Sequence, residues 1–315
     1  MIEISREKNF RFGPERICLE YYITHKCNFK CSYCYMKEDM KNSEDFDYNK
    51  FEKFKTFISK QKEDITLIIL GGEPLTIKQI PEITNEIFKL KPIKHIEIGT
   101  NGSLLKNFHN LGLTFFCSMH REYLNRVDDL IKGMKQNRNS TFIFNILLGY
   151  NEPLEQYKSI INKIIKEVGG YDEGIIFTFN VLVKSKNNEN YSIMDKIKFL
   201  TDYDFNLYFN VKIKDQTYKI NNNEIAEFFR MVDTRFKGCL CKIDTYYLAY
   251  NGDLRFSCSP STDIITNVYN DPSFIMEHKK ILCPYGRCDI SGFLNSKKIN
   301  NSKLENIIKS YKTPI

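Results

Sequence analysis

The sequence lacks the two features that direct a chain into a membrane or out of the cell. A membrane-spanning helix needs about 18 or more consecutive apolar residues, and no such run occurs in the 315 residues. The first residues, Met-Ile-Glu-Ile-Ser-Arg-Glu-Lys, do not contain the apolar stretch of a signal peptide. We therefore expect a cytoplasmic protein that makes no contact with a membrane.

Dense clusters of basic residues are also missing. The formal net charge is +7, but lysine and arginine are spread along the chain and do not form the block typical of a nucleic-acid arm. Binding to nucleic acid is therefore not expected, although the charge slightly favours an acidic substrate or partner. The sequence has no internal repeat or low-complexity tract, and its apolar content of 42% is enough for a sizeable folded core.

The cysteines that are present favour metal binding over disulfides. Disulfides are rare in the reducing cytoplasm. Eight of the ten cysteines fall in two groups, three at 27–34 and five at 239–288, and such grouping is typical of metal ligands. The other two, Cys18 and Cys117, lie in apolar strand-like runs, so we interpret them as small buried hydrophobic residues.

The first group consists of Cys27, Cys31 and Cys34 and has the spacing C-x3-C-x2-C. A 4Fe–4S cluster held by thiolates normally takes four of them, so three leave one iron without a protein ligand. An open metal position is where a substrate or cofactor binds, whereas a closed site is usually structural or carries electrons. The alternatives are a partial zinc site and three unrelated buried thiols.

Apolar strand-like runs alternate with amphipathic helical segments over the first part of the chain. This pattern predicts βαβ units and a parallel sheet, and by itself it fits either a doubly wound sheet or a barrel. The expected strands are Ile17–Ile23, Ile65–Leu70, His95–Gly99, Leu113–Ser118, Thr141–Leu148 and Ile175–Val183. The expected helices cover residues 48–62, 121–137 and 152–168.

The loop around the three cysteines resembles the signature of the radical SAM superfamily. It reads Cys27-Asn-Phe-Lys-Cys31-Ser-Tyr33-Cys34, and the family has an aromatic residue where Tyr33 stands. The resemblance implies that S-adenosylmethionine (SAM) chelates the open iron and is cleaved to a 5′-deoxyadenosyl radical, which abstracts a hydrogen atom from the substrate. It also implies an α/β fold, a partial (β/α)6 TIM-like barrel, with the active site at the carboxyl ends of the strands.

The same resemblance assigns contacts with SAM to the ends of later strands. The run Leu70-Gly71-Gly72-Glu73-Pro74 resembles the element that binds the SAM amino group. Thr100, Asn101 and Ser118 stand where the family contacts the ribose and the carboxylate. Taken alone, the first run is an ordinary Gly-Gly turn, and Asn101 belongs to a common Asn-Gly turn.

The adenine side of SAM is expected along the fifth predicted strand. Asn145, Leu147, Gly149 and Glu152 resemble the family pattern G-x-I-x-G-x-x-E, with departures at the first two positions. Val181 either packs on adenine or belongs to the core. Six polar residues near strand ends are candidates to face the substrate: His25, His120, Arg121, Asn145, Tyr150 and Asn180. His120 is the preferred candidate, and an ordinary surface or core histidine is an equal alternative for it.

The second cysteine group resembles a SPASM or twitch domain, the C-terminal auxiliary-cluster module of some radical SAM enzymes. The stretch Cys241-x10-Gly252-x5-Cys258, which includes a hairpin-like segment at Tyr246–Leu254, is one residue longer after the glycine than the family pattern. The five cysteines are fewer than in a full SPASM module, so the shorter twitch type is favoured. The resemblance implies a second 4Fe–4S cluster on four of them: Cys241, Cys258, Cys283 and Cys288.

Cys239 is the spare thiol in this assignment. It can exchange roles with Cys241, donate a hydrogen atom to a substrate radical, or have no role. A four-cysteine zinc site is the alternative for the whole group. We place a domain boundary within 205–235, near a strand at Asn206–Ile213 and a short helix at Glu224–Val232, and divide the chain into an N-terminal extension (1–16), the barrel (17–220) and a small auxiliary-cluster domain (221–315).

The function expected from these features is radical SAM chemistry with two iron–sulfur clusters. The substrate is a ribosomally made peptide or, as a close alternative, a small metabolite such as a sugar or aminocyclitol. The absence of a peptide-recognition domain before the barrel weakens the peptide interpretation. An electron donor such as flavodoxin or ferredoxin is the expected partner. A non-catalytic iron–sulfur or zinc protein is the alternative of another class.

Overall fold

A parallel sheet of six strands forms the centre of the computed structural model. The model describes residues 2–6, 16–32, 34, 36–41, 46–148, 154–169, 174–181, 208–221, 224, 228, 240–243, 245–256, 263–282, 298–299 and 302–315. The six strands pair in chain order, which confirms the predicted α/β sheet and fits a partial barrel. They are β2 (Ile17–Thr24), β3 (Ile65–Gly71), β4 (Ile93–Thr100), β5 (Thr114–Met119), β6 (Thr141–Leu148) and β7 (Ile175–Val181).

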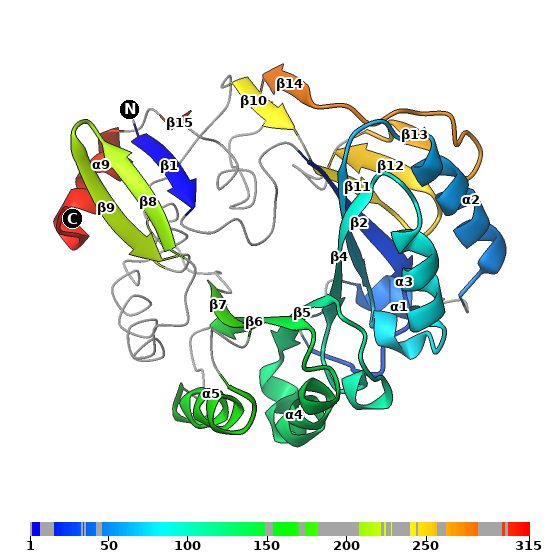
Figure 1. Ribbon diagram of the computed structural model, residues 1–315, viewed down its shortest axis with the longest axis horizontal. Helices are drawn as coiled ribbons and strands as arrows, with labels where there is room; N and C mark the ends of the chain where they lie inside the picture. Colours follow the sequence, from blue (N-terminus) through cyan, green and yellow to red (C-terminus); the bar gives the residue numbers. More distant parts are fainter. Residues whose placement is uncertain are drawn as a thin grey trace.

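Helices connect these strands and lie along the outer side of the sheet (Figure 1). They are α1 (Lys37–Lys41), α2 (Tyr48–Ser59), α3 (Ile80–Phe88), α4 (Val127–Gln136) and α5 (Leu154–Val168), with short 3-10 turns η1 (Pro74–Thr76), η2 (Leu105–Asn107) and η3 (Arg121–Arg126). The predicted helix at 121–137 is therefore two elements that meet at Arg126, whose backbone is not helical, and the first of them is kinked at Tyr123. Helix α3 was not predicted.

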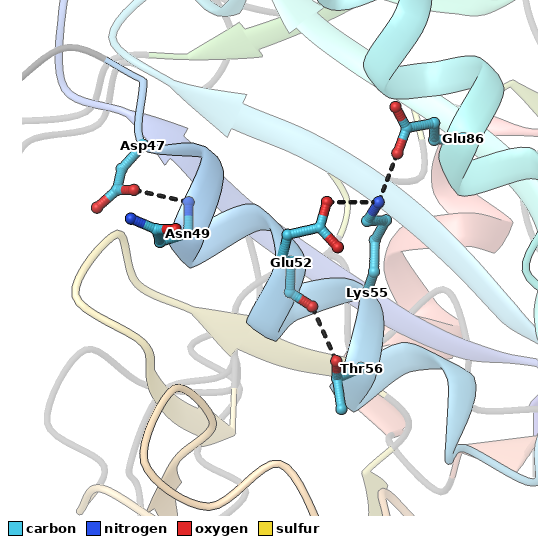
Figure 2. A network of polar contacts seen from close by, with 6 residues as sticks. All are labelled: Asp47, Asn49, Glu52, Lys55, Thr56 and Glu86. Atoms are coloured by element: carbon cyan, nitrogen blue, oxygen red, sulfur yellow. Dashed lines mark hydrogen bonds and ion pairs between the residues drawn. The ribbon is translucent and has the colours of Figure 1, made fainter.

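Helix α2 shows how local sequence fixes these elements. Asp47 begins it, since its Oδ1 accepts hydrogen bonds from the backbone N–H groups of the first turn, including that of Asn49 at 2.8 Å. Such a cap stabilises a helix by about 1 kcal/mol. Lys55 on the outer face lies between Glu52 and Glu86 of α3, at 2.7 and 2.5 Å (Figure 2). The other face is apolar and buried: Phe51, Phe54, Phe57 and Ile58.

Alternate residues of the strands face the helices or the interior of the curved sheet. In β2, the helix-side residues Ile17, Leu19, Tyr21 and Ile23 belong to the main apolar core. In β6, Phe142, Phe144 and Ile146 do the same, which leaves Asn145 on the opposite face. In these two strands the helix side is thus apolar, and the polar Asn145 lies on the inner side.

Strands from late in the chain extend the parallel sheet beyond β2. Strand β11 (Thr245–Leu248) pairs in parallel with β2, followed by β12 (Asp253–Phe256) and β13 (Thr266–Asn267). The hairpin predicted at Tyr246–Leu254 is confirmed, and Gly252 in its turn has φ +92°. The pairing with β2 was not predicted. A separate two-stranded sheet joins β10 (Leu240–Ile243) to β14 (Lys279–Leu282).

A four-stranded antiparallel sheet lies across from the parallel sheet in Figure 1. Its order is β15 (Lys298–Ile299), β1 (Ile2–Arg6), β8 (Tyr208–Ile213) and β9 (Gln216–Asn221), with α9 (Ser302–Tyr311) beside it. The strand predicted at Asn206–Ile213 is confirmed as β8. Strands from all three predicted segments pair in this sheet, and the boundaries at 16 and 220 stay predictions.

Two further expectations concern single elements. Of the helix predicted at Glu224–Val232, only Glu224 and Phe228 are described, and both are helical; the rest lies outside the described residues. In the described part of the chain, no helix combines the length and apolarity needed to cross a bilayer.

Candidate functional site

The loop that follows β2, residues 25–34, carries the three clustered cysteines and is called the cysteine loop below. Cys31 is buried, and Cys27 and Cys34 are half-buried; all three are free thiols. The Phe29 N–H donates to Cys27 Sγ at 3.4 Å, and the Cys34 N–H donates to the Cys31 carbonyl at 3.2 Å. Tyr33, the predicted aromatic residue, lies outside the described residues. The loop thus begins at the carboxyl end of the first barrel strand, as predicted.

The end of β3 lies directly against the start of the cysteine loop. The Gly72 N–H donates to the Thr24 carbonyl at 2.9 Å, and the Glu73 N–H donates to the Lys26 carbonyl at 2.7 Å. A Cβ atom on Gly71 would lie 2.2 Å from the Thr24 oxygen, and one on Gly72 would lie 2.3 Å from the Lys26 oxygen. Only glycine permits this approach, so the Gly-Gly pair sets the position of the loop.

The buried Glu73 carboxylate connects the end of β3 to the end of β4 through hydrogen bonds. Its Oε1 accepts hydrogen bonds from the Leu75 N–H at 3.0 Å and the Thr100 hydroxyl at 2.8 Å. Its Oε2 accepts one from the Asn101 N–H at 2.6 Å. Burial raises the pKa of Glu73 to about 7, although these hydrogen bonds act in the opposite direction. Glu73 also caps the turn η1, which begins at Pro74.

The turn after β4 holds the middle of the cysteine loop. The Asn101 side-chain amide donates to Asn28 Oδ1 at 2.8 Å, and the Asn28 amide donates to the Ser103 hydroxyl at 2.8 Å. Asn101 Oδ1 accepts from the Ser103 hydroxyl at 2.7 Å, which closes the set. Thr100 and Asn101 were predicted site residues, and the structure brings both to the loop. Asn28 and Ser103 were not predicted.

The segment after β5 contacts the second half of the loop. The Phe29 ring stacks on Tyr123 with centroids 3.7 Å apart, and His120 meets it edge-on at 6.1 Å. The Tyr123 hydroxyl accepts the Lys30 N–H at 2.9 Å. His120, the preferred substrate-facing residue, therefore packs against the cysteine loop, and its burial lowers its pKa.

A carboxylate from the same segment lies near the thiols. Glu122 Oε2 accepts the Ser32 N–H at 2.9 Å. Burial raises the pKa of Cys31 to about 11, and the negative charge of Glu122 is the next cause. Burial also raises the pKa of Cys27. Both thiols are therefore protonated in the metal-free chain at neutral pH, so metal binding must release their protons.

The ends of β5 and β6 bring two further predicted residues together. Ser118 and Asn145 are paired in register. Asn145 is buried, and its Oδ1 has no hydrogen-bond partner within the described residues. A buried acceptor without a donor costs about 1–3 kcal/mol, so this oxygen is a candidate acceptor for a ligand. Leu147 follows in β6; its side chain, Gly149 and Glu152 lie outside what is described.

The remaining candidates lie in three places. The His25 ring lies 5.2 Å from the Tyr250 ring, beside the start of the cysteine loop. Arg121 begins η3. Asn180 and Val181 end β7 in register with Leu147 and Leu148, and their side chains are not described. Tyr150 lies outside the described residues. Cys18 and Cys117 are buried, as predicted.

The second cysteine group is described only in part. Cys241 lies in β10 opposite Ile281 of β14, and β14 ends at Leu282, immediately before Cys283. The register thus pairs the strand that carries Cys241 with a strand that ends one residue before Cys283 in the sequence. Cys239, Cys258, Cys283 and Cys288 lie outside the described residues.

Comparison with known proteins assigns a family to the part of the chain that carries this site. Residues 21–164 match the model of the Radical SAM superfamily. This stretch is a radical SAM domain. It contains the cysteine loop and the ends of β2 to β6 described above.

Relatives at the sequence level include two enzymes named for one reaction. A probable GTP 3′,8-cyclase of Methanocaldococcus jannaschii is 36% identical over 101 residues, which are 31% of this chain and 32% of the relative. The GTP 3′,8-cyclase of Clostridium botulinum (strain Okra) is 28% identical over 122 residues, 38% of this chain and 36% of the relative. The matched part is therefore about a third of the length of these curated relatives.

A solved structure supports the fold over a longer stretch. Streptococcus suis SuiB bound to S-adenosylmethionine is 16% identical, has a TM-score of 0.52, and is matched over 82% of this chain and 64% of its own length. At this identity the likeness shows the fold alone. Enzymes of the radical SAM family use a 4Fe–4S cluster and SAM.

The donors in the described loop fit such a cluster. No three Cys, His, Asp or Glu side chains in the described part of the chain converge as they would around a single metal ion. A 4Fe–4S cluster binds each thiolate through a different iron, so its ligands need not meet at one point. Three free thiols on one loop suit such a cluster, and the Asn145 oxygen in β6 offers an acceptor on the inner face of the same sheet.

Proposed function

We propose that this chain is a radical SAM enzyme whose reaction begins at the cysteine loop. The observation that supports the proposal best is the junction of that loop with three consecutive strand ends, through Gly72, Asn101 and Tyr123. Cys27, Cys31 and Cys34 would hold three irons of a 4Fe–4S cluster and leave the fourth for SAM. When bound, the cluster and SAM together supply a 5′-deoxyadenosyl radical that abstracts a hydrogen atom from the substrate.

The protein's own residues would bind and orient SAM beside this loop. Gly71 and Gly72 let the backbone of β3 approach, and the buried Glu73 fixes the backbone of Asn101. Because both Glu73 oxygens already accept hydrogen bonds, we assign it a shaping role and leave direct contacts to backbone groups around Pro74. Ser118 and Asn145 offer further polar contacts from the inner face.

The test is anaerobic reconstitution with iron and sulfide. We expect a reduced cluster whose EPR spectrum changes when SAM is added, and release of 5′-deoxyadenosine with dithionite. A variant with Cys27, Cys31 and Cys34 all changed to Ala should lose the SAM-responsive signal. A wild-type protein that takes up zinc and no iron would contradict the proposal and favour the non-catalytic alternative.

The substrate we propose is a ribosomally made peptide, modified by crosslinking, epimerisation or oxidation. Support comes from the fold shared with SuiB, one of whose structures is bound to precursor peptide SuiA, at a TM-score of 0.51 and 15% identity. A nucleoside triphosphate is the second candidate, because the sequence relatives named above are GTP 3′,8-cyclases. Deuterium transfer from labelled peptide or labelled GTP into 5′-deoxyadenosine would separate the two.

The second cysteine group would hold an auxiliary 4Fe–4S cluster, with flavodoxin or ferredoxin as the electron donor. Support comes from the pairing of β10 with β14, which aligns the segments that carry Cys241 and Cys283. We expect about eight irons per chain in the wild type and about four in the variant that lacks Cys27, Cys31 and Cys34. Zinc in that variant, with no iron, would assign the group to a structural zinc site.

A further inference from the structure

Two neighbouring residues of η3 bind the backbone on either side of Cys31. The Tyr123 hydroxyl accepts the Lys30 N–H at 2.9 Å, and Glu122 Oε2 accepts the Ser32 N–H at 2.9 Å. The backbone is kinked at Tyr123, within η3, so the two side chains lie immediately before the kink and at it. Neither residue belongs to any motif of the sequence, so their role has to come from these contacts.

The apolar part of the same contact fixes the loop in position. Phe29 is 4% exposed and lies between the Tyr123 ring, the edge of His120 and the Arg126 guanidinium, which is 5.9 Å from the ring centroid. Such aromatic and cation–π contacts are attractive, so they hold the Phe29 ring in place. The stack places the Tyr123 hydroxyl at the Lys30 N–H, so packing and hydrogen bonding act on one short segment.

The two hydrogen bonds also determine which peptide N–H groups of the cysteine loop can donate to the sulfurs of a bound cluster. Peptide N–H groups that donate to cluster sulfurs raise the reduction potential, and fixed negative charge lowers it. The Lys30 and Ser32 N–H groups already donate to η3. In addition, Glu122 brings a negative charge one hydrogen bond away from the peptide that follows Cys31.

We propose that Glu122 and Tyr123 are positioning residues for the cluster on the cysteine loop, and that the charge of Glu122 keeps its reduction potential low. The inference rests on the proposed function, because it presupposes a cluster on Cys27, Cys31 and Cys34. Tyr123 would act mainly on retention of the cluster. Glu122 would act mainly on the potential, through its charge.

The decisive variant is Glu122→Gln, which keeps an oxygen to accept the Ser32 N–H and removes only the charge. We expect wild-type iron content, unchanged hydrogen exchange at the Ser32 amide, and a more positive midpoint potential for the SAM-responsive cluster. Glu122 is exposed, so salt should screen its effect, and the shift should shrink as ionic strength rises. A potential equal to that of the wild type at low salt would overturn the role of the charge.

The matched control is Glu155→Gln on α5, an exposed glutamate at a site away from the cysteine loop. It changes the net charge by the same amount, so a shift equal to that of Glu122→Gln would mean a non-specific effect and overturn the assignment. For Tyr123→Phe, which keeps the ring stack, we expect faster loss of iron to a chelator and a smaller change in potential. Iron loss at the wild-type rate would overturn the positioning role of the hydroxyl.

Measurements on the wild type distinguish a failure of this inference from a failure of the proposed function on which it rests. If the reconstituted wild type shows no SAM-responsive cluster, the proposed function fails. If it shows one, and the Glu122→Gln and Tyr123→Phe proteins match it in potential and in iron retention, only the positioning inference fails.

Discussion

The two halves of the cysteine loop are held in different ways. The first half, residues 25–28, and Thr24 just before it are joined to β3 and β4 by backbone pairing, two glycines and the buried Glu73. The second half is joined to η3 by a ring stack and two side-chain acceptors, Glu122 and Tyr123, near the surface. The first arrangement tolerates almost no change in shape, whereas the second can be adjusted one side chain at a time.

The largest effect is expected from Gly72→Ala in the first half. Its Cβ would lie 2.3 Å from the Lys26 oxygen and 2.6 Å from the His25 oxygen, so the loop must move. We expect a loss of about 1–3 kcal/mol in the free energy of unfolding and loss of the SAM-responsive EPR signal. Both are measured on the same preparation, by denaturant unfolding and by EPR.

Gly174→Ala is the control for backbone strain alone. Its φ of +81° disfavours alanine, but the nearest atom to a new Cβ is 3.5 Å away and belongs to Thr141. This variant should lose about 1–2 kcal/mol and keep the EPR signal. If Gly72→Ala also kept the signal, the close approach of β3 would not be needed to form the site.

The next effect concerns pH and the buried Glu73. Its pKa of about 7 in the folded chain lies above the usual 4.5, so the folded state keeps a proton that the unfolded state loses between these values. Stability should therefore fall as pH rises from about 4.5 to 7, by about 3 kcal/mol from this group. Urea unfolding of the metal-free protein across this range measures the slope.

Glu73→Gln supplies the comparison. We expect the Glu73→Gln protein to be less stable than the wild type at all pH values. Its side-chain NH2 group would face the Asn101 N–H, so two donors meet where the Glu73 oxygen accepted a hydrogen bond. It should nevertheless lack the part of the pH slope that Glu73 contributes. Equal slopes in the two proteins would show that Glu73 does not titrate in this range.

A smaller effect is expected in the second half from Phe29→Leu. The change keeps an apolar side chain but removes the stack on Tyr123 and the edge contact with His120. We expect a cost of about 1–2 kcal/mol and faster hydrogen exchange at the Lys30 amide. Phe46→Leu, which removes ring contacts with Tyr48 and Phe51 beside α2, should leave that amide unchanged.

The smallest effect is expected from Asn28→Ala, where the two halves meet. Asn28 is exposed and makes two side-chain hydrogen bonds, with Asn101 and Ser103. We expect a cost of about 1 kcal/mol and a cluster signal that persists. Complete loss of the cluster would mean that the hydrogen bonds between Asn28 and the turn after β4 are essential for cluster binding, and the contrast between the two halves would no longer hold.

This contrast also explains which features could be predicted from the sequence. Close backbone approach demands glycine, so Gly71 and Gly72 are visible in the sequence, and the alternation of apolar strand-like runs with amphipathic segments predicts the sheet. Tyr123 and Glu122 bind peptide N–H groups, which many residue types can do, and nothing in their spacing marks them. The kink at Tyr123 was missed because the apolar spacing of 121–137 is continuous with that of one helix.

Long-range pairing was the other limit. Residues Thr245–Leu248 have the composition of any strand, and no local signal indicates that they pair with β2. Likewise, His120 directly follows a strand and was predicted to face a substrate, but its ring packs on Phe29. Where a side chain near a strand end points depends on the neighbouring loop, which the periodicity of the strand does not encode.

The pairing of β2 with β11 has a consequence for the order of assembly in the cell. Thr245 pairs with Cys18 and Leu248 with Tyr21, so one edge of β2 stays open on the ribosome until most of the chain has been made. Contacts between such distant segments form slowly, and domains complete as their last strands emerge. The pairing of the strand that supports the cysteine loop is therefore completed late in folding.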